Sequence, residues 1–298
     1  MKLTKRQITS FQQKILSWWK THRRDLPWRH TRDPYRIMVS EVMLQQTQVL
    51  RVIAKYTEFI EAFPGVHNLA MASPADVLRI WKGMGYNRRA LYLQKAARLI
   101  VEHGSPVIPA NAGIQRKNVN FFDRIKFPKS EKELRKLPGL GKYTARALLV
   151  FAYEKEVALV DTNIRKIIMH YFLTKPTQGR ALEKEVEDIA RQLIPPGNSW
   201  DWHQALMDYG ALALPALTHS PIHPSRKKSL PFRDSNRFYR GRIIDRLREG
   251  DLEENNFIKE FQKKYPKPVI FFRSIIVGLI KDGLIQRYPG STLGLPDA

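Results

Sequence analysis

Apolar residues recur at spacings of three and four along most of the chain, which is the period of an amphipathic helix. The stretch 33–63 reads as two successive helices, and "SPADVLRIWKGM" (73–84) begins with a Ser cap followed by Pro at the first helical position. The basic segment 87–104 ends at Gly104, a common helix terminator. The same period predicts further helices at 8–22, 130–137, 142–154, 162–172, 179–194 and 200–214.

Two segments interrupt this pattern, and the chain changes character after the second one. Residues 105–129 have little helical period and Pro-bounded ends, so we expect an inserted surface loop. Residues 219–236 are rich in Pro, His, Ser and basic side chains and are expected to form a linker. Residues 237–298 predict three short helices and a Pro-Gly hairpin, a combination that resembles a winged helix-turn-helix.

Charge and cysteine content narrow the function classes. The 298 residues include 51 Lys and Arg against 28 Asp and Glu, giving a net charge of +23 and an isoelectric point near 10.2. This excess favours a polyanionic partner such as nucleic acid. The chain has no cysteine, which excludes disulfides, thiolate metal sites and thiol nucleophiles. Without a membrane-length apolar run or a signal peptide's apolar core, a cytoplasmic, nucleoid-associated monomer is expected.

The stretch "LPGLGKYTAR" (137–146) places a Pro and two Gly between two helical segments. We interpret it as a helix-hairpin-helix, in which Gly139 and Gly141 adopt backbone conformations closed to other residues. Free N–H groups at the start of the second helix would hold a phosphate oxygen, and Lys142 adds charge. Leu137 belongs to the same phosphate-binding turn. The alternative is a simple corner between two helices.

Twenty residues after Gly141, Asp161 ends the strand-like "VALV" and stands at the start of a helix. In isolation it would be a helix N-cap. Together with the hairpin it resembles the HhH-GPD superfamily of DNA base-excision glycosylases. Four further motifs are similar to MutY-type adenine DNA glycosylases, and the order and spacing match over most of residues 10–214: "DLPWR" (25–29), "SEVMLQQTQV" (40–49), "GMGYNRRALYLQKAA" (83–97) and "HQALMDYGA" (203–211).

The resemblance implies an all-α, two-lobed glycosylase core over residues 1–218, followed by the small winged-helix-like α+β domain. In this arrangement a helical lobe from about 30 to 150 is inserted between the N-terminal helix and residues 151–218. The core would act on double-stranded DNA carrying a mispaired or damaged base.

The resemblance also assigns catalytic roles. Glu41 is implied as the acid that protonates the departing adenine, and its apolar surroundings in "VSEVML" argue against an exposed helix carboxylate. Asp161 would stabilise the sugar cation, Tyr143 would hydrogen-bond in the same pocket, and Asn163 would position water and substrate. The flipped base would be held by Trp28, Arg29 and Gln204. Intercalation or contact with the opposite base would fall to Gln46, Thr47, Met84 and Tyr86.

The chain departs from this family after residue 213. Most relatives carry four cysteines there that bind an iron–sulfur cluster, whereas Leu214 stands at the first ligand position here. His203, His219 and His223 lack carboxylate partners in the sequence, so we expect no metal site and no cofactor. A monovalent cation at the hairpin is compatible with the resemblance. The basic run Arg226, Lys227 and Lys228 could still contact phosphates, as the cluster loop does in relatives.

The sequence therefore predicts a monofunctional glycosylase that excises adenine opposite guanine or 8-oxoguanine. No segment matches the domain with which the family recognises 8-oxoguanine. The winged-helix-like tail occupies that part of the sequence instead. Its role would be to contact DNA, to support the structure or to bind a partner. Two alternatives stay open. The first is a thymine glycosylase acting on T·G mispairs, because "GKYTA" and "VDTN" also resemble such enzymes. The second is a DNA-binding module that has no catalytic activity. Retention of Glu41, Tyr143 and Asp161 argues against the idle module.

Overall fold

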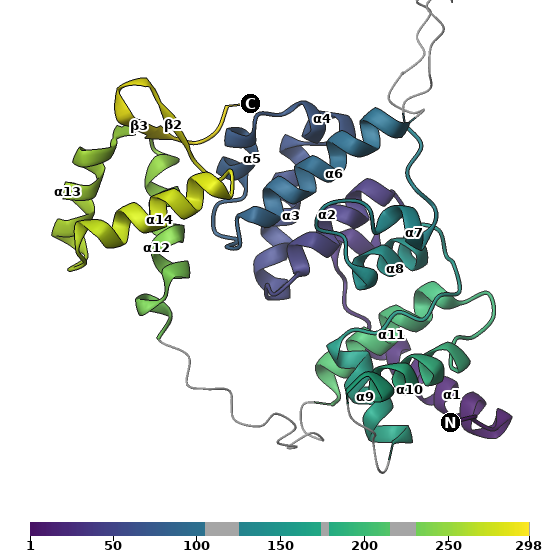
Figure 1. Ribbon diagram of the computed structural model, residues 1–298. Helices are drawn as coiled ribbons and strands as arrows, with labels where there is room; N and C mark the ends of the chain where they lie inside the picture. The colour runs from purple at the N-terminus through teal and green to yellow at the C-terminus, as the bar shows by residue number, and fades with distance from the viewer. Residues whose placement is uncertain (105–124, 174–178, 215–230, 298) are drawn as a thin grey trace, which may run out of the picture. The chain divides into compact units, whose positions relative to one another are not determined.

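The computed structural model describes residues 1–104, 125–173, 179–214 and 231–297 (Figure 1). The described chain is mostly helical, with one small sheet near the C-terminus, as the sequence predicts. Most of the expected inserted loop and of the expected linker lies outside the described residues, as do Arg226, Lys227, Lys228, His219 and His223. None of the helices in the described ranges has the length and apolarity needed to cross a membrane.

The chain divides into two units, each with its own internal packing. The first comprises residues 1–41, 128–136 and 140–224, and the second comprises 42–127, 137–139 and 225–298. The helices of the first unit are α1 (Lys5–His22), most of α2 (Pro34–Leu44), α7 (Glu131–Leu134), α8 (Lys142–Phe151), α9 (Thr162–Phe172), α10 (Gly179–Gln192) and α11 (Ser199–Leu212), with a 3-10 turn at Pro27–Arg29.

Helix α11 lies at the centre of the first unit, where it packs against α1, α8 and α9. Ten of its residues are buried, so it has no wide solvent-facing side. Helix α1 is amphipathic by contrast and buries only Phe11, Ile15 and Trp19. It begins with a capping box in which the Thr4 side chain accepts from the backbone N–H of Gln7 and the Gln7 side chain accepts from that of Thr4.

The predicted helix-hairpin-helix is formed by α7, the turn 135–141 and α8. Gly139 has a φ of 80°, which an L side chain rarely adopts, and a Cβ atom there would lie 3.1 Å from Cβ of Tyr92. The expectation that Gly141 also adopts a conformation closed to other residues is wrong, because its φ of −79° and ψ of −177° suit any residue. A Cβ atom at Gly141 would meet nothing within 4 Å, so a side chain would also fit at this position.

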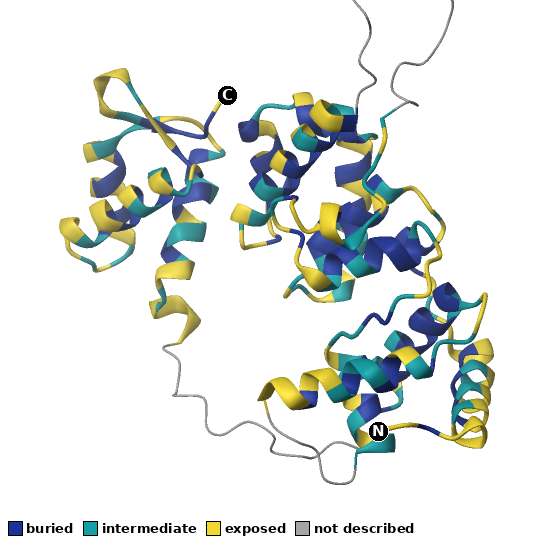
Figure 2. Ribbon diagram, turned by 45° about the vertical axis from the view of Figure 1, so that its right-hand side comes forward, coloured by how far each residue is buried: buried dark blue, intermediate teal, exposed yellow. Residues whose placement is uncertain are grey.

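The second unit contains the end of α2 and the helices α3 (Val49–Ala62), α4 (Val66–Met71), α5 (Pro74–Ile80) and α6 (Arg88–Gly104). Helix α6 packs against α4 and α5, and α3 packs against α5. The predicted cap of α5 is confirmed, since Ser73 Oγ accepts from the N–H of Asp76 at 3.0 Å. Figure 2 shows that buried and exposed residues share the same helices, as amphipathic sequences require.

The tail of the second unit has the predicted three helices and hairpin, which are α12 (Asn236–Leu247), α13 (Glu254–Lys264), α14 (Val269–Lys281), β2 (Gln286–Tyr288) and β3 (Thr292–Gly294). A two-residue strand that the sequence analysis did not predict, β1 (Leu252–Glu253), pairs antiparallel with β3, so the sheet order is β1-β3-β2. Short 3-10 turns stand at Phe232–Asp234 and Pro289–Ser291. This order of elements is that of a winged helix domain.

Candidate active site

The carboxylate of Glu41 is buried on helix α2, with 6% of the residue exposed. It is surrounded on its own helix by buried apolar residues, including Met38 and Val42. Burial raises the pKa of Glu41 to about 7; a hydrogen bond with Tyr143 opposes this and the charge of Asp161 adds to it. A carboxyl group with this pKa can hold a proton near neutral pH and donate it.

Tyr143 lies in the first turn of α8, directly after the hairpin. Its hydroxyl is hydrogen-bonded to Glu41, and burial together with the charges of Glu41 and Asp161 raises its pKa well above 10. The phenol is therefore a neutral donor. The hairpin thus brings a side chain from the start of α8 onto the acid of α2.

Asp161 is the N-cap of α9, and its Oδ1 accepts from the N–H of Ile164 at 2.7 Å. The expected strand before it is wrong, because "VALV" forms no sheet pairing in the described chain. Burial raises the pKa of Asp161, and backbone donors including the N–H groups of Ile164 and Asn163 oppose that rise. Asp161 can therefore be both a helix N-cap and a functional residue. The cap fixes the position of a carboxylate whose charge also acts on Glu41 and Tyr143.

Asn163 is held at the start of α9 by close packing against α11. A Cβ atom at Gly210 would lie 2.6 Å from Cβ of Asn163, closer than real side chains come, and 3.3 Å from its backbone, which is also tight. Gly210 therefore allows α9 and α11 to approach closely enough to keep Asn163 beside Asp161.

Arg29 and Asp208 form a buried ion pair that the sequence analysis did not foresee. Nη1 and Nη2 of Arg29 each lie 2.8 Å from one carboxylate oxygen of Asp208, which is completely buried. Trp19 Nε1 and Arg24 Nε donate to the same carboxylate at 2.8 and 2.5 Å. Burial acts to raise the pKa of Asp208, but Arg29, Trp19 and Arg24 outweigh it and lower the pKa.

The other two residues expected to hold the base, Trp28 and Gln204, are also buried, at 8% and 5% exposure. Nε of Arg29 is buried without a hydrogen-bond partner in the described part of the chain. His203, next to Gln204 on α11, accepts from the N–H of Leu159 through Nε2 and lies 2.7 Å from the carbonyl of Ser199 through Nδ1. Burial lowers the pKa of His203 to about 4, so it is a neutral packing residue.

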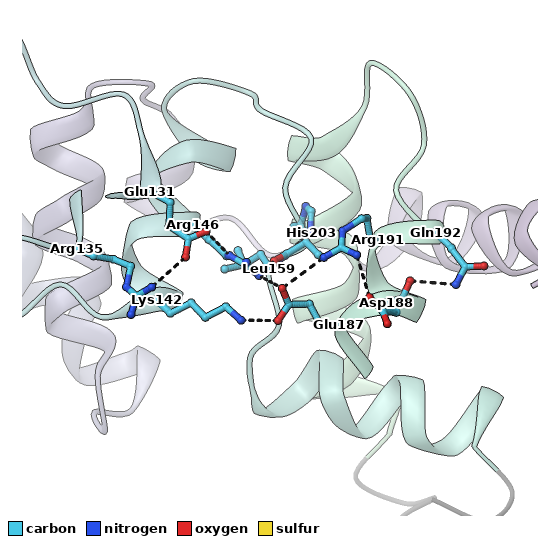
Figure 3. A network of polar contacts seen from close by, with 11 residues as sticks. Glu131, Arg135, Lys142, Arg146, Leu159, Glu187, Asp188, Arg191, Gln192 and His203 are labelled. Atoms are coloured by element: carbon cyan, nitrogen blue, oxygen red, sulfur yellow. Dashed lines mark hydrogen bonds and ion pairs between the residues drawn. The ribbon is translucent and has the colours of Figure 1, made fainter. Parts of the chain in front are cut away.

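Lys142 and Tyr143 are neighbours with different partners. Lys142 Nζ forms an ion pair with Glu187 of α10, and Glu187 also accepts from Arg146 at 2.8 Å (Figure 3). Arg146 in turn binds Glu131 at 2.8 Å and the carbonyl of Ala158 at 3.0 Å. This network joins the hairpin to α10 and engages the ammonium of Lys142, whereas the Tyr143 hydroxyl engages Glu41.

The residues expected to contact the base stack lie in the second unit, in the α2–α3 turn and in the 83–87 loop. Tyr86 is 40% exposed and Gln46 is also exposed, and both have left-handed backbones, with φ of 45° and 55°. Met84, at 2% exposure, belongs to the core beneath the loop. Thr47 is half-buried and accepts from Arg89.

Arg89 is a further residue that the sequence analysis missed. Its Nη1 donates to the carbonyls of Val42 and Met43 at 3.0 and 3.1 Å, and its Nη2 donates to that of Met84 at 3.2 Å. Burial lowers the pKa of Arg89 to about 10. The guanidinium thereby ties the α2–α3 turn to the 83–87 loop.

The residues present do not fit the iron–sulfur cluster that most of the resembled glycosylases carry. The chain has no cysteine, and Leu214, at the first ligand position, is buried with 1% exposure. Within the described ranges no three His, Asp or Glu side chains gather in a way that could hold a metal ion.

Comparisons with known proteins show which family the chain is similar to. Residues 39–196 match the family described as HhH-GPD superfamily base excision DNA repair protein. An adenine DNA glycosylase of Mycobacterium tuberculosis is 32% identical over 257 residues, which is 80% of this chain and 78% of that protein. The adenine DNA glycosylase of Rattus norvegicus is 33% identical over 229 residues, which is 72% of this chain but 41% of the rat protein's length.

Among solved structures, a thermostable thymine-DNA glycosylase matches with a TM-score of 0.60 at 29% identity. The match covers 74% of this chain and 90% of that structure.

Proposed function

We propose that this chain, which belongs to the HhH-GPD superfamily of base excision DNA repair proteins, is a monofunctional DNA glycosylase that removes adenine mispaired with 8-oxoguanine or guanine. The observation that carries the proposal is the joining of the buried Glu41 with the half-buried Tyr143 and Asp161, from three separate helices, in one polar cluster. The adenine DNA glycosylases to which the chain is similar support the choice of base.

The chemistry follows from the protonation states of this cluster. Glu41, protonated near neutral pH, donates its proton to a ring nitrogen of adenine. The glycosidic C–N bond then breaks with its electron pair moving onto the base, which leaves an oxocarbenium ion on the sugar. The Asp161 carboxylate stabilises this cation, and water adds to the sugar carbon and gives up a proton, which restores the protonated state of Glu41. The products are free adenine and an intact abasic site.

Three buried residues of the unit that holds the cluster are proposed to form the base pocket. Trp28 supplies an apolar surface, Gln204 an amide, and the unpartnered Nε of Arg29 a donor toward a flipped base. Because Arg29 is fixed by two hydrogen bonds to Asp208, the pocket is preorganised on the protein side. Asn163, held by the Gly210 contact, positions water or sugar.

Binding to duplex DNA is assigned to the hairpin and to the exposed loops. The N–H groups at the start of α8, where a side chain at Gly141 would meet no atom within 4 Å, would bind a phosphate oxygen, with Leu137 and Gly139 shaping the turn. Lys142 would exchange Glu187 for phosphate on binding, and Arg226, Lys227 and Lys228 would add phosphate contacts. Gln46, Thr47 and Tyr86 would enter the vacated stack, with Met84 beneath them.

The proposed enzyme works as a monomer at the nucleoid and needs no iron–sulfur cluster. The purified protein is expected to be colourless and to keep its helicity and base release after exhaustive treatment with chelator. Loss of either would show that the protein depends on a metal.

A second candidate is thymine release from T·G mispairs, favoured by the match to a thymine-DNA glycosylase. The deciding experiment is single-turnover base release by the full chain from otherwise identical duplexes that contain A·8-oxoguanine, A·G or T·G. We expect release from both adenine duplexes and little from T·G, because thymine lacks the purine ring nitrogens that Glu41 would protonate. Faster release from T·G than from both others would establish the second candidate.

A further inference from the structure

Within the second unit, a groove of about 900 Å³ separates the 83–89 loop from helix α12 of the C-terminal domain, here residues 231–297. Helix α12 lines it through Arg237 and Arg240, and the residue that caps the C-terminus of the helix, Arg248, lines it as well. Arg248 anchors the helix to the loop side, because it donates to the carbonyl of Leu78 at 2.9 Å and to Oδ1 of Asn87 at 3.1 Å. Hydrogen bonds of Arg248 therefore hold the two walls of the groove together.

The charge of the groove is strongly positive. Among the described residues, seven arginines and two aspartates line it. Both aspartates are already paired, Asp282 with Arg240 at 2.5 Å and Asp245 with Arg248. Arg237 has no carboxylate within ion-pair distance in the described chain. A long groove with this unbalanced charge fits a polyanionic strand rather than an acidic side chain.

Two strained residues stand at the edge of this groove. Gln46 and Tyr86 both line it, and both have left-handed backbones without being glycine. A conformation of this kind is energetically unfavourable and persists only where surrounding structure enforces it, often at functional sites. The hydrogen bonds of Arg89 to both loops provide that enforcement.

The C-terminal domain acts on the same tyrosine from the other wall. The guanidinium carbon of Arg237 lies 5.0 Å from the ring centroid of Tyr86, and Arg237 also donates to the Tyr86 hydroxyl. A second ring, that of Phe232, lies 5.0 Å from the same guanidinium. Arg237 thus fixes the direction of an exposed aromatic side chain on the other wall of the groove.

The third helix of the tail is a poor candidate for contact with DNA. In helix-turn-helix domains the recognition helix enters the major groove and carries polar and basic side chains. Helix α14 exposes three apolar residues, Val269, Ile270 and Val277, at 38%, 76% and 59% exposure, beside the exposed Arg273, Ser274 and Lys281. The unbalanced positive charge is therefore denser along the groove, where α12 lies, than on α14.

We propose that this groove binds the backbone of the DNA strand opposite the excised base, and that Arg237 is a positioning residue that orients Tyr86 for insertion into the stack. The identity of the strand rests on the proposed glycosylase function. Arg242, which is exposed on α12 and lines the groove, contacts phosphate. The C-terminal domain thereby takes part in holding the mispair without presenting its third helix.

The test uses the full chain and a duplex with a non-cleavable adenine analogue opposite 8-oxoguanine, with 2-aminopurine beside the 8-oxoguanine. Arg237→Ala and Arg242→Ala are compared with Arg273→Ala, a matched change at an exposed arginine of α14 outside the groove. We expect Arg242→Ala to weaken binding severalfold and to lower the salt slope of log K by about 0.9, the loss of one phosphate contact. Arg273→Ala should match wild type in both.

Arg237→Ala is expected to abolish most of the rise in 2-aminopurine fluorescence that reports unstacking, and Arg237→Lys is expected to restore binding but not the fluorescence, because an ammonium lacks the planar guanidinium. In a Tyr86→Ala background, Arg237→Ala should change the fluorescence no further. The proposal is overturned if the groove variants behave like Arg273→Ala, or if Arg273→Ala is the most damaging. Failure of wild type to release any base would instead reject the glycosylase function, and the binding measurements would still judge the groove.

Discussion

The hydroxyl of Tyr143 is hydrogen-bonded to the carboxyl group of Glu41, although the two residues are 102 positions apart in the chain. The hairpin places Tyr143 in the first turn of α8, and α2 buries Glu41. Burial keeps the acid protonated near neutral pH against the opposing effect of this hydrogen bond, and the hydrogen bond holds the carboxyl group in one orientation. Proton donation to a departing base requires both.

The pH dependence of base release should follow this acid. Because burial raises the pKa of Glu41 to about 7, the protonated fraction falls as pH rises through 7. The single-turnover rate should therefore decline by about tenfold per pH unit above that value. Glu41→Gln should lose this alkaline limb. A wild-type profile that stays flat from pH 6 to 9 would contradict the role of Glu41.

The stability of the fold should also depend on the protonation state of Glu41, and like base release it should favour the neutral acid. The folded-state pKa of about 7 lies above the ordinary value of 4.5, so the unfolded chain ionises Glu41 first. The free energy of unfolding of wild type should therefore fall, relative to Glu41→Gln, as pH rises from about 4.5 to 7. Parallel denaturant titrations of the two proteins measure this, and equal pH dependence would contradict burial of the charge.

Tyr143→Lys should gain strand-cleaving activity. An amine at this position can attack the sugar and form a Schiff base, which borohydride traps on DNA, whereas a phenol cannot. Wild type should leave intact abasic DNA that breaks only in alkali. The amine of Lys142 forms an ion pair with Glu187 and should not take the place of an amine at position 143. Efficient trapping of wild type that disappears in Lys142→Ala would show that Lys142, not Tyr143, faces the sugar.

Gly210→Ala should destabilise the protein and slow base release. The added methyl would lie 2.6 Å from Cβ of Asn163, so α9 must shift away from α11. Overpacking of this kind costs about 1–3 kcal/mol. Gly241→Ala is the matched control, because a methyl there meets nothing within 4 Å and should be neutral or slightly stabilising. Equal unfolding midpoints for the two variants would argue against the contact.

The hydrophobic period and the capping residues predicted most of the helices, including α5 with its Ser73 cap and α9 with Asp161. The sequence pattern did not predict the shorter elements. Helix α4 has six residues and β1 two, which is too few for a period to emerge. The "VALV" stretch was misread because apolar residues there are buried by helices, and burial alone does not distinguish this from a strand.

The candidate site was predicted in part, and the limits have a physical origin. Sequence motifs single out Glu41, Tyr143 and Asp161 because each follows a recognisable local signal. The partners of Arg29 and Arg89 carry no such signal. Asp208 lies 179 positions from Arg29, and Arg89 binds backbone carbonyls, which every residue has. Long-range pairs and main-chain acceptors become visible only once the chain is folded.

The most direct test of the account is single-turnover adenine release by Glu41→Gln, with Glu61→Gln, an exposed change on α3, as control. The account predicts that Glu41→Gln lowers the rate by at least roughly 10²–10⁴-fold, the loss typical of a general acid, while affinity for the duplex stays near that of wild type. Glu61→Gln should match wild type in both. Near-normal release of adenine by folded Glu41→Gln protein would contradict the central claim that the buried Glu41 supplies the proton.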